Sequence, residues 1–282
     1  TKLFILILIY MLVGWVISKY SAKGGQAFAK RLNEDKEFRD KITLSRKLRK
    51  GTDWIKRASL EGVKVQREIR EKENNRIRTN LLKKLDNSLS FSLVAQLCGF
   101  LAGDGDIRVR KNKNGWLHHE IKFYPDDLKM AHVFINTFKE LYEKEPSITP
   151  LHNFYRVRVT SKVACSHLLE LSTFDTHNWK VPQFVLSNKD YKREFLRAIF
   201  DCEASVGKRN IQFQSVNKNG IYQIKDLLAD FGILSQVYSY KRSNPNWSTN
   251  YILVIGRKEN IKRYAECIGF NHSKKMDKLI VL

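Results

Sequence analysis

Residues 97–106 read Leu-Cys-Gly-Phe-Leu-Ala-Gly-Asp-Gly-Asp, and residues 196–205 read Leu-Arg-Ala-Ile-Phe-Asp-Cys-Glu-Ala-Ser. Both stretches have the same pattern, an apolar helix with small residues that ends on an acid. The two acids, Asp104 and Glu203, lie 99 residues apart. A repeat at this spacing predicts a duplicated unit whose two copies pack about a pseudo-two-fold axis.

Small residues recur at positions i and i+4 of each predicted helix. They are Gly99 and Gly103 in the first copy, and Ala198 and Cys202 in the second. Small side chains on one helix face let two backbones approach closely, so the paired helices would bring both acids to one place. Two converging carboxylates are typical of a Mg²⁺ site, because this ion prefers oxygen ligands. The alternative is two ordinary buried helices that end on capping acids.

The duplicated motif resembles that of the LAGLIDADG homing endonucleases in their single-chain, two-motif form. The resemblance covers residues 92–275, about two thirds of the chain. The first motif departs from the usual pattern at Cys98 and Ala102, and the second at Ala198 and Ala204. Because none of these departures removes an acid, we expect them to affect helix packing more than activity.

The segments that follow each motif predict the same order of elements twice. In the first copy, alternating segments predict strands at 107–110, 121–123 and 155–159, and helices at 126–142 and 164–171. In the second copy, strands are expected within 206–214, 234–242 and 250–255, and helices at 219–231 and 259–268. The expected fold class is α+β, with two pseudo-symmetric α-β-β-α-β-β-α repeats that form a DNA-binding β-saddle. The repeats are assigned to residues 91–180 and 181–282.

One face of the predicted strands is rich in basic and amide side chains, since alternate residues of a strand point to opposite faces. Arg and Lys can read guanine, and Gln can read adenine, from a strand in the major groove. A solvated strand face is the alternative, but the one-sided excess of Arg, Gln and Tyr favours DNA. The candidate DNA-binding residues are Arg108, Arg110, Lys122, Arg156, Arg158, Lys208, Arg209, Gln212, Gln214, Tyr238, Tyr240 and Arg242.

The composition agrees with a polyanionic partner. The formal net charge is +22 on 282 residues, and such a field favours a phosphate backbone through the release of counterions. A membrane surface is the competing explanation for the charge alone. A hydrophobic content of 43% is sufficient for a sizeable core, so the chain is not a disordered basic tail.

The resemblance implies a Mg²⁺-dependent endonuclease that hydrolyses the phosphodiester bonds of double-stranded DNA across the minor groove. It implies short 3′ overhangs within a long target site. It also implies that Asp104 and Glu203 ligate Mg²⁺, and that the backbone carbonyls of Gly103 and Cys202 complete the ligand set. No side chain is needed as the nucleophile, since a metal-bound water can attack the phosphate.

The resemblance further implies a catalytic basic residue from each repeat near the active sites. Lys162, and Arg257 or Lys258, follow the last predicted strand of their repeats and are the candidates. The alternative is that they lie at a helix start or touch a backbone phosphate.

Two readings of function stay open beside the endonuclease. One is a maturase that acts on intron RNA, and the other is a sequence-specific DNA-binding protein of the same fold without useful cleavage. The chain has no Cys or Ser start with a His-Asn end, which favours an intron-encoded protein over an intein. Two complete copies in one chain predict a monomer, because the symmetric interface is already formed within the chain.

The region before the repeats differs in kind. Residues 19–90 are dense in Lys and Arg and predict a basic helical extension, which either adds phosphate contacts or is a solvated linker. Residues 1–18 contain an apolar run that is slightly short for a membrane span. It is read as a truncated transmembrane or signal segment, as upstream exon sequence, or as noncoding sequence before a start at Met11. The last two are favoured, and membrane association stays an alternative.

The four cysteines show no Cys-x-x-Cys or Cys-His spacing, so neither zinc nor a disulfide framework is expected. They read as small buried side chains that suit a reducing compartment. We therefore expect an intracellular protein located with DNA, in the cytoplasm or nucleoid or in an organelle matrix.

Overall fold

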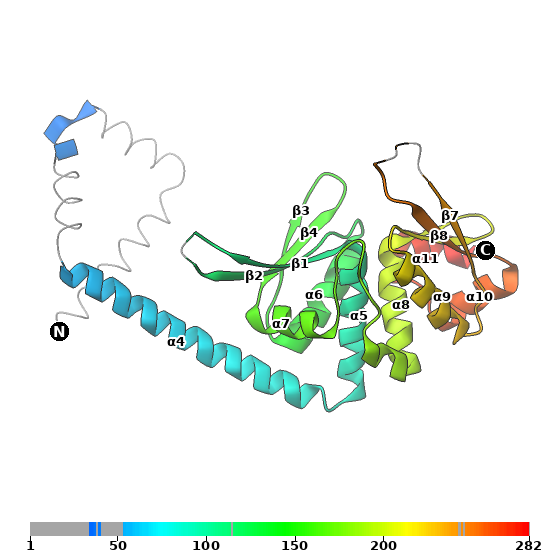
Figure 1. The fold of residues 1–282 in the computed structure, drawn as a ribbon, viewed down its shortest axis with the longest axis horizontal. Helices are drawn as coiled ribbons and strands as arrows, with labels where there is room; N and C mark the ends of the chain where they lie inside the picture. The colour runs from blue at the N-terminus through cyan, green and yellow to red at the C-terminus, as the bar shows by residue number, and fades with distance from the viewer. Residues whose placement is uncertain are drawn as a thin grey trace. The chain divides into compact units, whose positions relative to one another are not determined.

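The computed structural model describes residues 34–37, 39–40, 53–113, 115–241, 244 and 246–281, and it describes side chains in the first long helix from residue 60 onward. Contacts divide the chain into two compact units, Thr1–Arg70 and Glu71–Leu282. Both repeats lie in the second unit (Figure 1). The apolar segment at 1–18, much of the predicted extension at 19–90, and Arg242 lie outside the described residues.

The later part of the predicted extension is one helix, α4 (Asp53–Lys84). Its final turns are packed within the second unit, where Ile77 and Leu81 are buried. Arg76 Nη1 donates to Glu143 Oε2 at 2.7 Å. The end of α4 is therefore part of the core of the second unit and not a solvated linker.

The first repeat has the predicted order of elements. They are α5 (Ser88–Asp104), β1 (Gly105–Lys111), β2 (Leu117–Phe123), α6 (Leu128–Tyr142), β3 (Ser147–Pro150), β4 (Tyr155–Thr160) and α7 (Lys162–Leu171). Polar side chains begin its helices: Asn87 accepts from Leu89 N, Asp127 from Met130 N, and Ser161 from Ala164 N. Each cap satisfies one backbone N–H that has no partner within the helix.

The second repeat repeats this order, with a short helix η1 (Gln183–Ser187) before it and an added helix α11 after it. Its elements are α8 (Lys189–Glu203), β5 (Ala204–Val206), β6 (Ile211–Ser215), α9 (Lys218–Ala229), β7 (Gln236–Tyr240), β8 (Asn250–Ile255), α10 (Lys258–Cys267) and α11 (Ser273–Ile280). The fold class is therefore confirmed as α+β with two α-β-β-α-β-β-α repeats.

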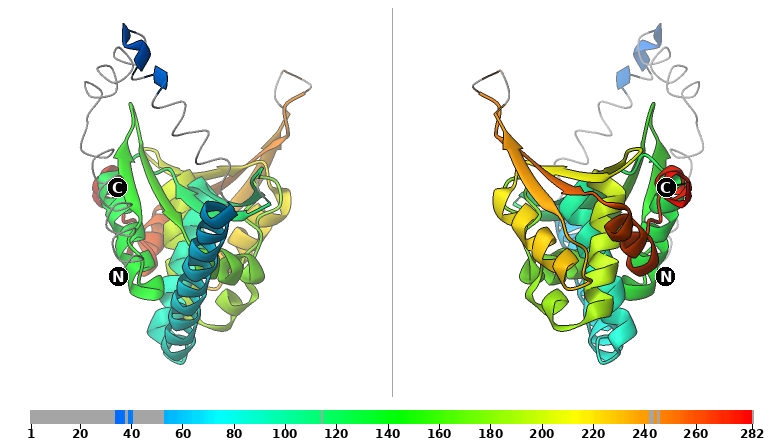
Figure 2. Two further views of the ribbon diagram at one scale, coloured as in Figure 1. Left: turned by 90° about the vertical axis from the view of Figure 1, so that its left-hand side faces the viewer. Right: turned by 90° about the vertical axis from the view of Figure 1, so that its right-hand side faces the viewer.

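Each repeat contains one four-stranded antiparallel sheet. The strand orders are β1-β2-β4-β3 and β5-β6-β8-β7, so the two sheets have equivalent topology. Most helices of this unit lie on one side of the sheets (Figure 2). Strand residues that face the helices, such as Ile121, Phe123, Phe213 and Leu253, are fully or almost fully buried.

The core joins the two repeats through α5 and α8. Aromatic packing is equivalent on the two sides: the ring centroids of Phe100 and Phe123 lie 5.0 Å apart, and those of Phe200 and Phe213 lie 5.1 Å apart. Each pair packs a motif helix against the second strand of its own sheet. The sheets are thus held in equivalent positions relative to the central helix pair.

No single helix in the described ranges is long and apolar enough to cross a membrane. One bent pair, Leu60–Lys84 with Ser88–Asp104, passes the test on length and composition alone. Much of α5 is buried in the protein core, which accounts for its apolar composition.

Candidate active site and DNA interface

Helices α5 and α8 pack in direct backbone contact (Figure 1). A Cβ on Gly99 would lie 2.5 Å from the carbonyl oxygen of Phe195 and 2.8 Å from the Cβ of Ala198. A Cβ on Gly103 would lie 2.5 Å from the Cβ of Cys202. Side chains larger than hydrogen therefore do not fit at either glycine without moving a helix. The predicted close approach is present at both positions.

This contact brings Asp104 and Glu203 together at the ends of their helices. A Cβ on Gly103 would be 3.7 Å from Glu203 Cγ. Burial raises the pKa of Glu203 to about 7, and the charge of Asp104 adds to this rise. Burial also raises the pKa of Asp104, against the lowering effect of the Cys202 thiol. The two carboxylates thus form a confined pair whose double ionisation is unfavourable without a cation.

Lys275, at the start of α11, supplies positive charge to this pair. Its Nζ donates to the carbonyl oxygens of Cys202 at 3.2 Å and Phe200 at 3.4 Å, and also to that of Asp201. These carbonyls end α8, where a cation is favoured by the helix dipole. The Lys275 ammonium also lowers the pKa of both Asp104 and Glu203.

The segment before α11 fixes Lys275 in place. Asp201 is fully buried, and its Oδ1 accepts from the backbone N–H of Asn271 at 2.8 Å and of His272 at 2.9 Å. His272 Nε2 lies 3.2 Å from Oδ1 of Asp126, which belongs to the first repeat. The C-terminal segment therefore connects the two repeats beside the acids.

The two other basic candidates are placed differently. Lys162 is exposed at the start of α7, and Arg257 is exposed at the N-cap of α10 with φ of 62°. Neither contributes to the pKa shift of Asp104 or Glu203, whereas Lys275 does. The basic residue next to the acids is thus one that strand spacing did not identify.

The carboxylate pair fits a divalent cation that takes its remaining ligands from elsewhere. In the described part of the chain, no group of three or more His, Cys, Asp or Glu side chains could hold a metal ion. Mg²⁺ is commonly bound by one or two carboxylates together with substrate phosphates and waters. Two backbone carbonyls were expected as further ligands. The carbonyl of Cys202 already accepts a hydrogen bond from Lys275 Nζ. The carbonyl of Gly103 belongs to the residue directly before Asp104 at the end of α5.

The strand register places the predicted residues of the first repeat on one sheet face. This first face contains Asp106, Arg108, Arg110, His118, Glu120, Lys122, Arg156, Arg158 and Thr160. Two acids that we did not single out also lie there: Glu120 pairs with Lys122 at 2.7 Å and with Arg158, and Asp106 pairs with Arg108. The first face is therefore a network of fixed charges with an excess of cations.

The equivalent second face has no carboxylate, ammonium or guanidinium group at its described strand positions. It contains Ser205, Gln212, Gln214, Gln236, Tyr238, Tyr240, Asn250, Ile252 and Val254. Lys208 and Arg209, which we expected on the strands, lie in the turn between β5 and β6. They therefore lie at the edge of this face and not in it.

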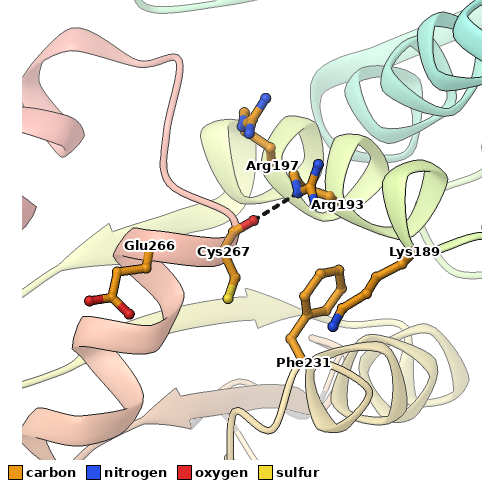
Figure 3. Close-up of a pocket in the computed structure, with 6 residues that line it drawn as sticks. All are labelled: Lys189, Arg193, Arg197, Phe231, Glu266 and Cys267. Atoms are coloured by element: carbon orange, nitrogen blue, oxygen red, sulfur yellow. Dashed lines mark hydrogen bonds between the residues drawn. The ribbon is translucent and has the colours of Figure 1, made fainter.

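A pocket of about 420 Å³ lies on the second repeat, between α8, α10 and Phe231 (Figure 3). Its two guanidinium groups are already paired: Arg193 Nη1 donates to Asp190 at 2.8 Å, and Arg197 Nη1 donates to Glu194 at 2.8 Å. Arg193 Nε also donates to the carbonyl of Cys267 at 3.0 Å, as Figure 3 shows. The pocket lies along α8 before its acidic end and takes no part in the carboxylate site.

Comparison with known proteins supports the resemblance drawn from the motifs. Residues 190–269 match the family model described as a LAGLIDADG-like domain. The structure is similar to that of a mesophilic variant of the homing endonuclease I-DmoI, with a TM-score of 0.52 and 17% identity over 64% of this chain and 96% of that chain. The complex of I-DmoI with DNA and Mn gives the same TM-score and covers 97% of that chain. The fold is thus that of a LAGLIDADG protein.

Two curated relatives come from Methanocaldococcus jannaschii. A glutamine–fructose-6-phosphate aminotransferase is 29% identical over 191 residues, which are 65% of this chain and 17% of that protein. A replication factor C small subunit is 26% identical over 191 residues, 66% of this chain and 10% of that protein. The chain thus matches only a minor part of two proteins whose names describe unlike activities.

Proposed function

We propose that this chain, which has the LAGLIDADG fold, is a site-specific DNA endonuclease with a divalent cation at Asp104 and Glu203. The observation that carries the proposal is the meeting of these two acids at the contacting ends of α5 and α8, between two equivalent sheets. An acid from each repeat at a shared centre gives one carboxylate for each DNA strand.

The chain contributes binding, placement and charge to the reaction. The first and second faces would lie along the major groove, which admits a two-stranded β-ribbon, and this would place the DNA backbone over the acids. Asp104 and Glu203 would hold Mg²⁺. This ion would stabilise the negative charge that develops on the phosphate and would lower the pKa of a bound water. Lys275 offsets the mutual repulsion of the acids from the protein side.

The partial matches to unlike proteins support a module with a function of its own. The same length of sequence, 191 residues, aligns with a minor part of an aminotransferase and of a replication factor subunit. Neither activity is therefore assigned to this chain. We further propose that the chain acts as a monomer, because its two repeats already pair α5 with α8.

Binding of DNA without cleavage is the second candidate, and the geometry of the second repeat favours it. Lys275 Nζ already donates to the carbonyl of Cys202, which is one of the expected metal ligands. This contact opposes cation binding in this half of the site until DNA phosphates add their charge.

Incubation with a plasmid library of random inserts, with and without Mg²⁺, separates the two candidates. Sequencing of new ends should give one site family with staggered cuts, and Asp104→Asn and Glu203→Gln should each abolish double-strand cleavage while keeping specific binding. Enrichment of a bound sequence without any cut by the unaltered chain would favour the second candidate. Full cleavage by either variant would refute the assignment of the acids.

A further inference from the structure

The two sheet faces differ in chemistry although their topology is equivalent. The first face carries Arg, Lys, Asp and Glu at its register positions, and the second face carries Gln, Tyr, Ile and Val. Because the sheets occupy equivalent places in the two repeats, each would meet one half of a bound duplex. The two halves of the target would therefore be read by different side chains.

Apolar residues on the second face stand directly beside amides. Val254 pairs with Gln212 on one side and with Gln236 on the other. Ile252 pairs in the same way with Gln214 and Tyr238. Each set of three residues paired across β6, β8 and β7 forms a row. Neighbouring strands lie about 4.8 Å apart, so the apolar side chain of each row has a polar side chain at that distance on either side.

These apolar side chains do not belong to the helix-facing core. Ile252 and Val254 are partly exposed, whereas their strand neighbours Leu253 and Ile255 point to the helices and are fully buried. Burial of a partly exposed branched side chain against another apolar group is favourable. A ligand with methyl groups next to hydrogen-bonding atoms would match these rows.

An A·T pair presents this combination in the major groove. Adenine offers an N7 acceptor and an N6 donor that suit the amide of Gln, and thymine adds a C5-methyl group that suits Ile or Val. A G·C pair has no methyl group. Asn250, which is 3% exposed, donates to Gln214 Oε1 at 3.3 Å and so holds this amide at the sheet surface.

The first face has the groups that suit guanine. Arg side chains bind the O6 and N7 acceptors of guanine through two N–H groups. Arg110 is exposed on this face, and Arg156 is half-buried there. Lys122 and Arg158 are held in position by Glu120.

We propose that the target of this chain has two unlike halves, of which the half over the second repeat is rich in A·T pairs read through thymine methyl groups, and the half over the first repeat contains the guanines. This inference rests on the proposed function and names the class of DNA that the site would take. It assigns Ile252 and Val254 as specificity-determining residues.

The test begins with selection of random double-stranded DNA by the full chain carrying Asp104→Asn, which keeps the substrate uncut. Thymine is then replaced by deoxyuridine in one half of the selected duplex at a time, which removes only the methyl group. Each contacted methyl removed from the A·T-rich half should weaken binding about fourfold. The same replacement in the other half should change binding less than twofold.

A matched pair of variants assigns the halves to the repeats. Val254→Ala should abolish the sensitivity to deoxyuridine at the thymine that Val254 contacts and leave the sensitivity at the thymine beside Ile252. Val109 lies on the side of the first sheet that is opposite the first face, and it is 43% exposed. Val109→Ala should leave the sensitivity to deoxyuridine unchanged.

The outcomes separate this inference from the proposed function. Selection of a defined site with equal composition in both halves, or with no effect of deoxyuridine, would overturn the inference and leave the endonuclease proposal standing. If no sequence is enriched at all, both proposals fail.

Discussion

Gly103 and Cys202 are packed so closely that a Cβ on the glycine would lie 2.5 Å from the Cβ and 2.9 Å from the sulfur of the cysteine. Each residue directly precedes the acid of its repeat. The distance between the helix backbones at this point therefore sets the distance between Asp104 and Glu203. The absence of a Cβ at Gly103 therefore allows both the close helix packing and the meeting of the two acids.

Gly103→Ala should consequently harm both stability and activity. The added methyl group has no space and must push α5 from α8, which we expect to cost about 1 to 3 kcal/mol in the free energy of unfolding. Urea unfolding measures this cost. Gly62→Ala is the control, since it is also in a helix but has nothing within 4 Å, and it should not lower stability. An equal loss in both variants would contradict the packing argument.

Glu203→Gln should stabilise the metal-free protein at alkaline pH. Because the folded protein raises the pKa of Glu203 from 4.5 to about 7, it holds the proton more tightly than the unfolded chain does. This contribution is complete below pH 4.5 and is lost as the pH rises through about 7. The variant should thus match the unaltered protein near pH 4 and exceed it by about 3 kcal/mol at pH 8. Thermal unfolding across this range provides the measurement, and equal stability at both pH values would contradict it.

Lys275→Met should make the carboxylate pair harder to ionise. Loss of the ammonium removes hydrogen bonds to the last carbonyls of α8 and should cost about 2 kcal/mol. A merely structural role would lower stability equally at every pH. Instead, the pH at which the Glu203 contribution disappears should move upward, because Lys275 lowers the pKa of that acid. Lys274→Met, which alters an exposed neighbour, is the matched control and should leave this pH unchanged.

The central helix pair could be predicted because its determinants are local. Small residues four positions apart and a terminal acid are visible in each motif, and both features are present in the structure. The first face was also predictable, since Arg108 and Arg110 alternate with Ile107 and Val109 in a clear period of two. These patterns are produced by burial on one side of a helix or strand.

Other parts of the site depend on contacts between distant segments. Lys275 reaches the end of α8 only because α11 follows a segment pinned by Asp201, and no periodicity encodes that contact. In β8, residues 251–255 are continuously apolar or aromatic, so the sequence does not show that Ile252 and Val254 lie on the open face. Only the structure shows that Leu253 and Ile255 are buried against the helices, while Ile252 and Val254 lie on the opposite face of the sheet.

Glu120→Gln should weaken the discrimination between target and random DNA. Glu120 is 6% exposed, and its pairing with Lys122, and then with Arg158, lowers its pKa, so it is ionised and holds both cations on the first face. Without the Glu120 carboxylate, Lys122 and Arg158 can bind DNA phosphates instead. The affinity for random DNA and its salt dependence should therefore increase. Specific binding should gain less, because the cations lose their fixed orientation toward bases.

Titration of target and random duplexes at several salt concentrations measures both effects. Glu145→Gln changes the net charge equally at an exposed pair with Lys139, and neither of these residues is among those of the first face. If Glu145→Gln narrows the ratio of the two affinities as much as Glu120→Gln does, net charge and not the position of Glu120 is responsible.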